Sequence, residues 1–470
     1  MTVASLAGAP AFAPGTAVTR GVSDTARAGL GEIDGRTVSW FALGGGPHRG
    51  AIGEAEGIVV ERAVRLATEL GVPVVGTLAT SGAEVGAGVV GLHAWGRVAR
   101  ELTRASGVVP IVLTVTGPCV SGPALMLALA DHVVMTADAF AYVSGPDAVA
   151  QMTGMVLDHR QLGGPAVHAT RTGLASLVVE SKEAAEDAVA DLLSFLPSNH
   201  LEAEHPPVAF VDDPVDRECD LAATAIPERA TASYDVRDVV RDVLDVDTFL
   251  EVRARNATNI VTAYGRLGGR AVAVVANQPC QRAGTIDISA SHKAARFVQS
   301  CDAFNLPIVT FVDTPGFEPG KELEWRGMIR HGAQLVHAYA EATVPRLCVV
   351  LRKAYGGAYI VMDSKGMGND YCVAWPSAEI AVMGASGAVA VLFGRRLAEM
   401  DDGEKRGAER VRLEDEYAAT YLSPWLSAER GLVDEVIEPS RTRSVLIDAL
   451  RCLVTKRDGG PQRRHSNGPL

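Results

Sequence analysis

The chain contains 470 residues, of which 47% are hydrophobic and 21% are charged. This is the balance of a globular protein, and the length suffices for two or three domains with cores of their own. The net charge of −12 excludes the strongly basic surface of a typical nucleic-acid-binding protein.

The cysteines and the N-terminus give predictions about the compartment. The seven cysteines are scattered, odd in number and without a CxxC pair, which argues against a disulfide framework and against a zinc ribbon. Residues 1–20 lack the regions of a signal peptide, and no apolar run reaches the ~20 residues of a membrane-spanning helix. We therefore expect a cytoplasmic protein without a membrane segment.

Short apolar runs alternate with helical patterns along the chain. In chain order, the patterns predict a helix at 63–70, strands at 73–76, 111–115, 133–135 and 142–144, a helix at 293–304 and a strand at 347–351. Buried strands that alternate with helices predict parallel sheets with right-handed crossovers.

The two halves of the chain also repeat each other. Pro73 precedes Pro307 by 234 residues, and Gly122 precedes Gly357 by 235 residues. Further matches follow in the same order at nearly the same offset, so we predict a duplicated domain. Residues 1–200 would form the first copy and 236–470 the second. Residues 201–235 are rich in Pro, Asp and Glu and are predicted to be a linker.

Several sequence segments carry a family resemblance. The second half contains VANQP (275–279), DISASHKAARF (287–297), TFVDTPG (310–316) and RKAYGGAY (352–359), and the first half contains GPC (117–119) and SGPD (144–147). These segments resemble the carboxyltransferase (β) subunits of biotin-dependent acyl-CoA carboxylases, such as propionyl-CoA carboxylase, in the crotonase superfamily. The resemblance implies an α/β fold with two tandem crotonase-like ββα-spiral domains.

The same resemblance implies the partners and the division of labour. The first domain would hold an acyl thioester such as acyl-CoA, and the second would hold biotin carried on a separate protein. The expected partner is a biotin carboxylase with its biotin carboxyl carrier subunit. The family usually forms a homohexamer, with each active site between the first domain of one subunit and the second domain of another.

Carboxyl transfer of this kind passes through two enolates, and each negative oxygen needs fixed N–H donors. Backbone amides at a strand-to-helix turn can supply them. A strong side-chain base is not required, because the biotin nitrogen can take the α-proton. By resemblance, the donors facing biotin are Gly357 and Ala358. In the first copy the donors would be Ser121 and Gly122, because Pro123 has no N–H. The residues expected to bind substrate are Gly356, Tyr359 and Ile360.

Three departures from the family pattern concern the acyl carrier. The lead-in before the first strand is short, residues 42–54 are rewritten and contain His48, and Glu84 stands where the family carries a basic residue. The short lead-in and Glu84 predict weaker binding of the CoA phosphates. The apolar Ile360 predicts a pocket that accepts more than propionyl groups.

Two other functions compete with carboxyl transfer. The first is a biotin-independent decarboxylase or acyl-transfer enzyme of the crotonase type. The second is a non-catalytic assembly subunit, although such a scaffold has no need of the RKAYGGAY segment.

The remaining polar residues have structural interpretations. Asp313 is predicted to form a turn, Lys293 to be structural or on a helix surface, and the histidines 292, 331 and 337 not to form a metal site.

Overall fold

The computed structural model describes residues 23, 25–202, 213–227, 229, 232–456, 458, 460 and 465–469. Residues 1–20, judged above for a signal peptide, and 203–212 of the predicted linker lie outside the described residues. The chain divides into two compact units. The first comprises the described residues within 1–208, 252–256 and 303–305, and the second comprises those within 209–251, 257–302 and 306–470.

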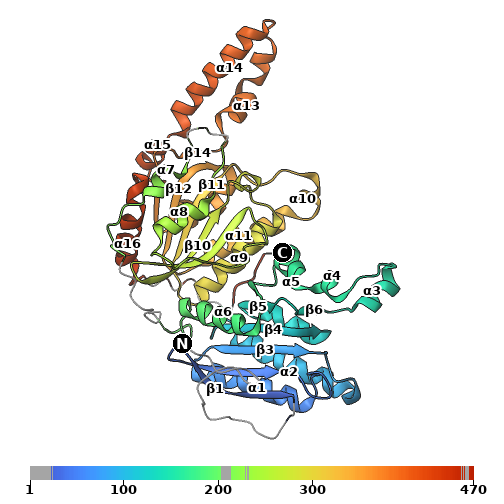
Figure 1. Ribbon diagram of the computed structural model, residues 1–470. Helices are drawn as coiled ribbons and strands as arrows, with labels where there is room; N and C mark the ends of the chain where they lie inside the picture. Colours follow the sequence, from blue (N-terminus) through green and yellow to red (C-terminus); the bar gives the residue numbers. More distant parts are fainter. Residues whose placement is uncertain are drawn as a thin grey trace. The chain divides into compact units, whose positions relative to one another are not determined.

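The first unit is built on a seven-stranded sheet with the order β1-β2-β3-β4-β5-β7, in which β6 pairs with β4 (Figure 1). The first two strands are antiparallel and the other pairings are parallel. The strands are β1 (Ala26–Ile33), β2 (Arg36–Leu43), β3 (Val74–Thr80), β4 (Ile111–Val120), β5 (His132–Thr136), β6 (Phe140–Tyr142) and β7 (Leu177–Val179). The helices are α1 (Glu54–Leu70), η1 (Val85–Ala87), α2 (Val89–Ala105), η2 (Gly122–Leu129), α3 (Pro146–Thr153), α4 (His159–Gly163), α5 (Pro165–Val167), η3 (His168–Thr172) and α6 (Lys182–Phe195).

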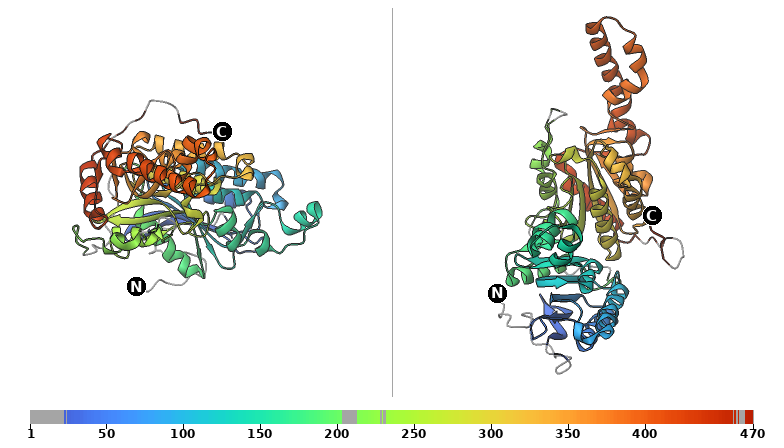
Figure 2. Two further views of the ribbon diagram at one scale, coloured as in Figure 1. Left: turned by 90° about the horizontal axis from the view of Figure 1, so that it is seen from above. Right: turned by 90° about the vertical axis from the view of Figure 1, so that its right-hand side faces the viewer.

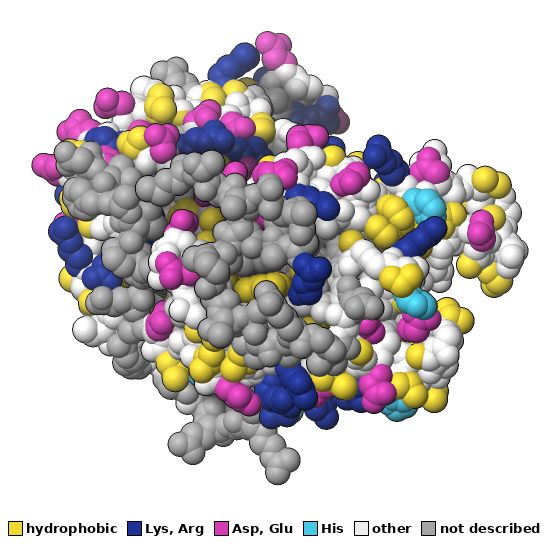
Figure 3. All heavy atoms as spheres, turned by 60° about the horizontal axis from the view of Figure 1, so that its bottom comes forward, with side chains coloured by type: hydrophobic (Ala, Val, Ile, Leu, Met, Phe, Trp, Pro, Cys, Tyr) yellow, Lys and Arg dark blue, Asp and Glu magenta, His cyan; other side chains and the backbone are white. Residues whose placement is uncertain are grey.

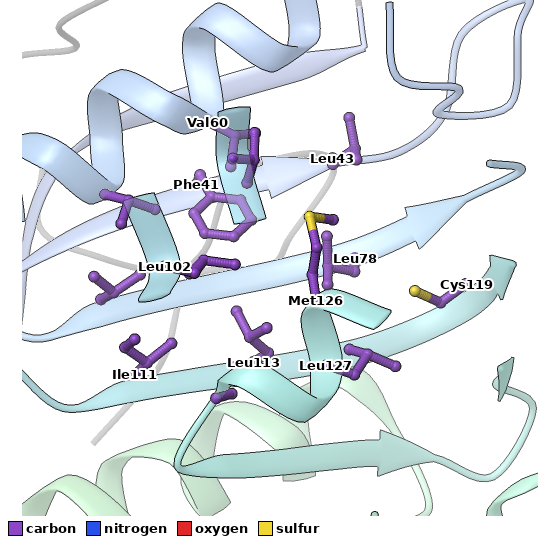
Figure 4. Close-up of a cluster of buried hydrophobic side chains, with 14 of the residues drawn as sticks. Phe41, Leu43, Val60, Leu78, Leu102, Ile111, Leu113, Cys119, Met126 and Leu127 are labelled. Atoms are coloured by element: carbon purple, nitrogen blue, oxygen red, sulfur yellow. The ribbon is translucent and has the colours of Figure 1, made fainter. Parts of the chain in front are cut away.

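The core of the first unit lies between this sheet and the helices α1, α2 and η2 (Figure 4). Phe41 and Leu113 extend from the strands toward Val60 of α1 and Met126 of η2, and all four side chains are buried. The residues of η2 therefore anchor the turn that joins β4 to this helix.

The second unit is built on an eight-stranded sheet with the order β15-β13-β12-β11-β10-β9-β8, in which β14 pairs with β12. The strands are β8 (Leu250–Glu251), β9 (Ile260–Leu267), β10 (Arg270–Asn277), β11 (Ile308–Thr314), β12 (Arg346–Tyr355), β13 (Tyr371–Ala374), β14 (Glu379–Ala381) and β15 (Glu435–Val436). The helices are α7 (Asp220–Ala225), α8 (Val236–Val243), η4 (Arg282–Gly284), α9 (Ile288–Ala303), α10 (Lys321–Trp325), α11 (Met328–Glu341), α12 (Gly356–Val361), η5 (Lys365–Met367), α13 (Ala385–Ala398), α14 (Gly403–Tyr417), η6 (Ala418–Leu422), α15 (Pro424–Glu429), η7 (Pro439–Arg441) and α16 (Thr442–Leu453).

The two sheets share one topology. Setting aside β8, strands β9 to β15 repeat the order and the pairings of β1 to β7. Each copy opens with an antiparallel hairpin whose two turn residues have positive φ, Asp34 and Gly35 in the first and Gly268 and Gly269 in the second. Such turns match the twist of the strands that they join. The predicted duplicated α/β topology is therefore confirmed.

Part of the predicted linker is folded. Helix α7 lies within it, and Cys219 and Ala222 are fully buried in the core of the second unit. In the same unit, α13 and α14 form a hairpin of two helices that projects from the sheet (Figures 1 and 2). No helix of the described ranges combines the length and the apolar content needed to cross a membrane.

Candidate active site

The turn between β12 and α12 presents backbone N–H groups. The strand ends at Tyr355, and Gly356 follows with a φ of 60°, a conformation that glycine adopts without strain. Helix α12 begins at Gly356, and its N-cap residue Tyr355 makes no side-chain capping bond. The first amides of a helix have no partner within that helix. The N–H groups of Gly357 and Ala358 are therefore available to donate hydrogen bonds to an oxyanion.

Contacts of Tyr355 hold this turn in place. Its hydroxyl donates a hydrogen bond to the carboxylate of Glu379 at the start of β14. Its ring lies against Gly384, where a β-carbon would come within 3.1 Å of the ring. Burial and the nearby Glu379 carboxylate raise the pKa of Tyr355, so the hydroxyl keeps its proton and the bond persists.

A buried ion pair fixes the strand that leads into the turn. Arg352 on β12 lies 3.0 Å from the Asp313 carboxylate on β11, and the same carboxylate accepts the N–H of Lys353 at 3.1 Å. Burial raises the pKa of Asp313, and Arg352 opposes that shift. Asp313 is 1% exposed and stands next to last in β11, at the strand end as predicted, but its carboxylate does not form a turn. Its carboxylate instead joins two strands.

The turn between β4 and η2 stands at the equivalent place in the first unit. Ser121 follows β4 with a φ of 64°, as Gly356 follows β12 with 60°. Val120 pairs with Tyr142 of β6 as Tyr355 pairs with Ala381 of β14. Ser121 therefore corresponds to Gly356, Gly122 to Gly357 and Pro123 to Ala358.

This correspondence changes the interpretation of Ser121. Its N–H donates to the carbonyl oxygen of Tyr142 at 2.9 Å, so this amide is already used by the sheet. The expectation that Ser121 donates to a substrate oxygen conflicts with that bond. Gly122 opens η2, and its N–H has no partner within the helix. Of the two predicted donors in the first copy, Gly122 is the one whose N–H the sheet leaves available.

Each copy also carries a basic side chain in contact with a glutamate near its turn. His48 Nδ1 lies 3.0 Å from Glu84, and Arg282 lies 2.9 Å from Glu318. Both members of the first pair stand 234 residues before their counterparts in the second. The N–H of Glu84 donates to Ile52, and the N–H of Glu318 donates to Ile286, each at 3.0 Å. The sequence distinguishes His48 and Glu84 as departures from the family but does not predict that they pair.

Comparisons with known proteins identify the family. The model of the carboxyl transferase domain matches residues 10–467. The chain belongs to the carboxyl transferase family. It is 44% identical to the carboxyltransferase subunit of propionyl-CoA carboxylase from Haloferax mediterranei, over 94% of this chain and 85% of that protein. It is 42% identical to the biotin-dependent acetyl-/propionyl-coenzyme A carboxylase beta5 subunit of Mycobacterium tuberculosis, over 96% and 83%.

A solved structure agrees with this membership. The transcarboxylase 12S hexamer, with methylmalonyl-coenzyme A and methylmalonic acid bound, superposes with a TM-score of 0.91 at 40% identity. The match covers 95% of this chain and 85% of that one. The predicted crotonase-type fold, the predicted family and the predicted enzyme class, a carboxyltransferase, are thereby confirmed.

The other predicted site residues of this carboxyltransferase lie along α12. Tyr359 is 7% exposed, and burial beside Cys372 and Cys348 raises its pKa. Its side chain is thus part of the interior of the second unit. Ile360, in contrast, is 44% exposed and presents an apolar surface next to the turn.

Two of the histidines discussed above are neighbours in the second unit. The rings of His292 and His331 have their centroids 4.5 Å apart and their planes tilted by 47°. Within the described ranges, no group of three or more His, Cys, Asp or Glu side chains could hold a metal ion. Lys293 is buried and donates to the carbonyl oxygen of Ile260 at 2.8 Å, which is the structural role that the sequence predicted.

Proposed function

We propose that this carboxyltransferase moves a carboxyl group from carboxybiotin on a carrier protein to the α-carbon of an acyl thioester. The observation that carries the proposal is the uncapped first turn of α12, with the amides of Gly357 and Ala358 after a left-handed glycine. Fixed backbone donors of this kind stabilise a developing negative oxygen without reorganising. Biotin, when bound, supplies the carboxyl group.

The chain's own residues bind and orient the two reacting partners. The N–H groups of Gly357 and Ala358 would hold the ureido oxygen on the biotin side. The N–H of Gly122 would hold the thioester oxygen on the acyl side. The donor set fits these two groups, because each accepts hydrogen bonds through a carbonyl-type oxygen and needs no charged partner.

The proposal also specifies which acyl groups react and how strongly CoA thioesters bind. Ile360 offers an apolar wall next to the turn, and each buried CH₂ contributes about 0.8 kcal/mol, so acyl groups other than propionyl are expected to react. Glu84 already pairs with His48 and gives no positive partner to a phosphate. We expect weak binding of free CoA thioesters, which isothermal titration with acetyl-, propionyl- and butyryl-CoA measures. Tight binding of propionyl-CoA alone would contradict both expectations.

Assembly is the next part of the proposal, and a homohexamer is the state that we expect. Large apolar side chains are exposed on both units, including Val85 of η1, Val89 at the start of α2, and Val391 and Leu392 on α13. On the face shown in Figure 3, hydrophobic side chains are exposed among acidic and basic ones. Where exposed apolar side chains gather into one patch, they are typical of interfaces. A monodisperse monomer in light scattering at micromolar concentration would argue against the hexamer.

The partners follow from the same chemistry. A biotin carboxylase and a biotin carboxyl carrier subunit would load the carboxyl group and deliver it to α12. We place the protein in the cytoplasm, and the seven cysteines support this because all of them are free thiols.

The deciding experiment measures fixation of labelled bicarbonate. Purified carboxyltransferase is mixed with ATP, a biotin carboxylase, a biotinylated carrier and a panel of acyl thioesters on CoA or on acyl carrier protein. Label in an acid-stable product that requires biotin and a thioester supports the proposal. Decarboxylation of a malonyl-type thioester without biotin would favour the biotin-independent enzyme, and the absence of both reactions would favour the assembly subunit.

A further inference from the structure

The two turns differ by one hydrogen-bond donor. The second copy offers the amides of Gly357 and Ala358, and the equivalent residues of the first copy are Gly122 and Pro123. Proline has no N–H, and the N–H of Ser121 is bound to Tyr142. An enolate oxygen at the first turn therefore meets one backbone donor where the second turn supplies two.

An unpaired indole N–H lies beside the deficient turn. Trp95 of α2 packs on Gly122, so that a β-carbon built on Gly122 would lie 2.8 Å from Cε2 and 3.1 Å from Nε1 of the indole. Trp95 Nε1 is buried and has no hydrogen-bond partner among the residues that the structure describes. A buried donor without a partner destabilises a fold by about 1–3 kcal/mol. Such a group in a native structure therefore requires an explanation.

The indole and the Gly122 amide are close enough to share one oxygen. By standard geometry, the Gly122 nitrogen is about 2.5 Å from the built β-carbon. Trp95 Nε1 lies 3.1 Å from the same point, so the two nitrogens are at most about 5.6 Å apart. One oxygen that accepts two hydrogen bonds of about 2.9 Å can bridge up to about 5.8 Å.

We propose that the indole N–H of Trp95 is the second donor of the acyl-side oxyanion site and replaces the amide that Pro123 lacks. This inference rests on the proposed carboxyltransferase function. When the α-proton is removed, for which the ureido nitrogen of bound biotin would be the acceptor, negative charge develops on the thioester oxygen. The indole donates a hydrogen bond to that oxygen while keeping its own proton. Indole is a donor only and carries no charge, so this contribution does not vary with pH.

The role of Trp95 also explains why residue 122 is glycine. Its φ is not in the left-handed region, so the backbone alone does not require glycine there. The indole ring does, because any side chain at 122 would occupy the space in which Trp95 lies.

Three variants test the proposal with the full chain: Trp95→Phe, Pro123→Ala and the double variant. Loss of one oxyanion donor lowers kcat by about 100- to 1,000-fold. We expect Trp95→Phe to show a fall of that size in thioester carboxylation, with little change in KM for the thioester. Pro123→Ala restores the missing amide, so the double variant should recover to within about tenfold of the wild type.

Two comparisons separate a donor role of Trp95 from a purely structural one: the recovery of activity in the double variant, and an isostere of tryptophan that lacks the N–H. Replacement of Trp95 with its benzothienyl analogue keeps the ring shape and removes the N–H, so it should be as slow as Trp95→Phe with an unchanged melting temperature. Full activity of the isostere, or a double variant as slow as Trp95→Phe, overturns the proposal. A wild type that fixes no label overturns the proposed function itself, whereas an active wild type with an equally active isostere overturns the role of Trp95 alone.

Discussion

Replacing Gly357 by proline isolates one N–H of the turn at the start of α12. Gly357 does not have a positive φ, and a β-carbon built on it meets Phe317 at an ordinary 3.6 Å. Alanine therefore fits at this position, and proline is tolerated in the first turn of a helix. The variants Gly357→Ala and Gly357→Pro both add a side chain, but only the second removes the N–H.

The expected effect follows from the lost donor. One missing oxyanion donor raises the barrier by about 2.7–4 kcal/mol, which corresponds to a fall of about 100- to 1,000-fold in kcat. Gly357→Ala should stay within about tenfold of the wild type, because the amide remains. The assay is the initial rate of label transfer from the carboxylated carrier to the thioester.

Matched controls make this comparison decisive. Circular dichroism and light scattering should give the same folded content and the same oligomer for Gly357→Pro and Gly357→Ala. If Gly357→Pro were as active as Gly357→Ala, the amide of residue 357 would have no part in the reaction.

Two further predictions concern stability. In Gly76→Ala the new β-carbon would collide with the ring of Phe41 and lie 2.6 Å from Leu113, so the free energy of unfolding measured in urea should fall by about 1–3 kcal/mol. In the control Gly96→Ala on α2, the new β-carbon has nothing within 4 Å, so the free energy of unfolding should not fall. Equal effects of the two substitutions would contradict the packing argument. Burial, with Glu183 and Asp187 nearby, raises the pKa of Glu186 to about 7. The protonated form is favoured by the fold, so its contribution to stability is present at acidic pH and is lost as pH rises through about 7. The melting temperature of Glu186→Gln relative to the wild type should therefore increase between about pH 5 and pH 8, and a constant difference would refute the shift.

The repeat made the topology predictable, because strand and helix patterns that recur in the same order at one offset indicate two copies of one fold. The strands predicted at 73–76, 111–115 and 133–135 overlap β3, β4 and β5. The helices predicted at 63–70 and 293–304 overlap α1 and α9. The strand predicted at 142–144 was misplaced, since β6 ends at Tyr142. The carbonyl of Tyr142 accepts the N–H of Ser121, and that long-range bond leaves no signal in the local sequence.

The candidate site was only partly predictable for the same reason. Gly357 and Ala358 follow from a contiguous segment, and the structure places both in the first turn of one helix. Trp95 lies in a different element from Gly122, and no spacing rule connects the two. The pair of His48 with Glu84 could have been found, since both positions fall at the same offset from Arg282 and Glu318, but only once the copies are aligned residue by residue.

The hairpin of α13 and α14 has a consequence for local motion. Its own core, among the described residues, consists of Val389, Leu397 and Leu413, whereas β12 lies in the middle of a sheet with buried neighbours on both sides. A segment with so few buried contacts opens at a lower free energy than the global unfolding of its domain. The backbone amides of the hairpin should therefore exchange with deuterium well before those of β12. Any protein surface that covers Val391 and Leu392 would slow that exchange, so the hairpin can report on assembly while the sheet remains unchanged.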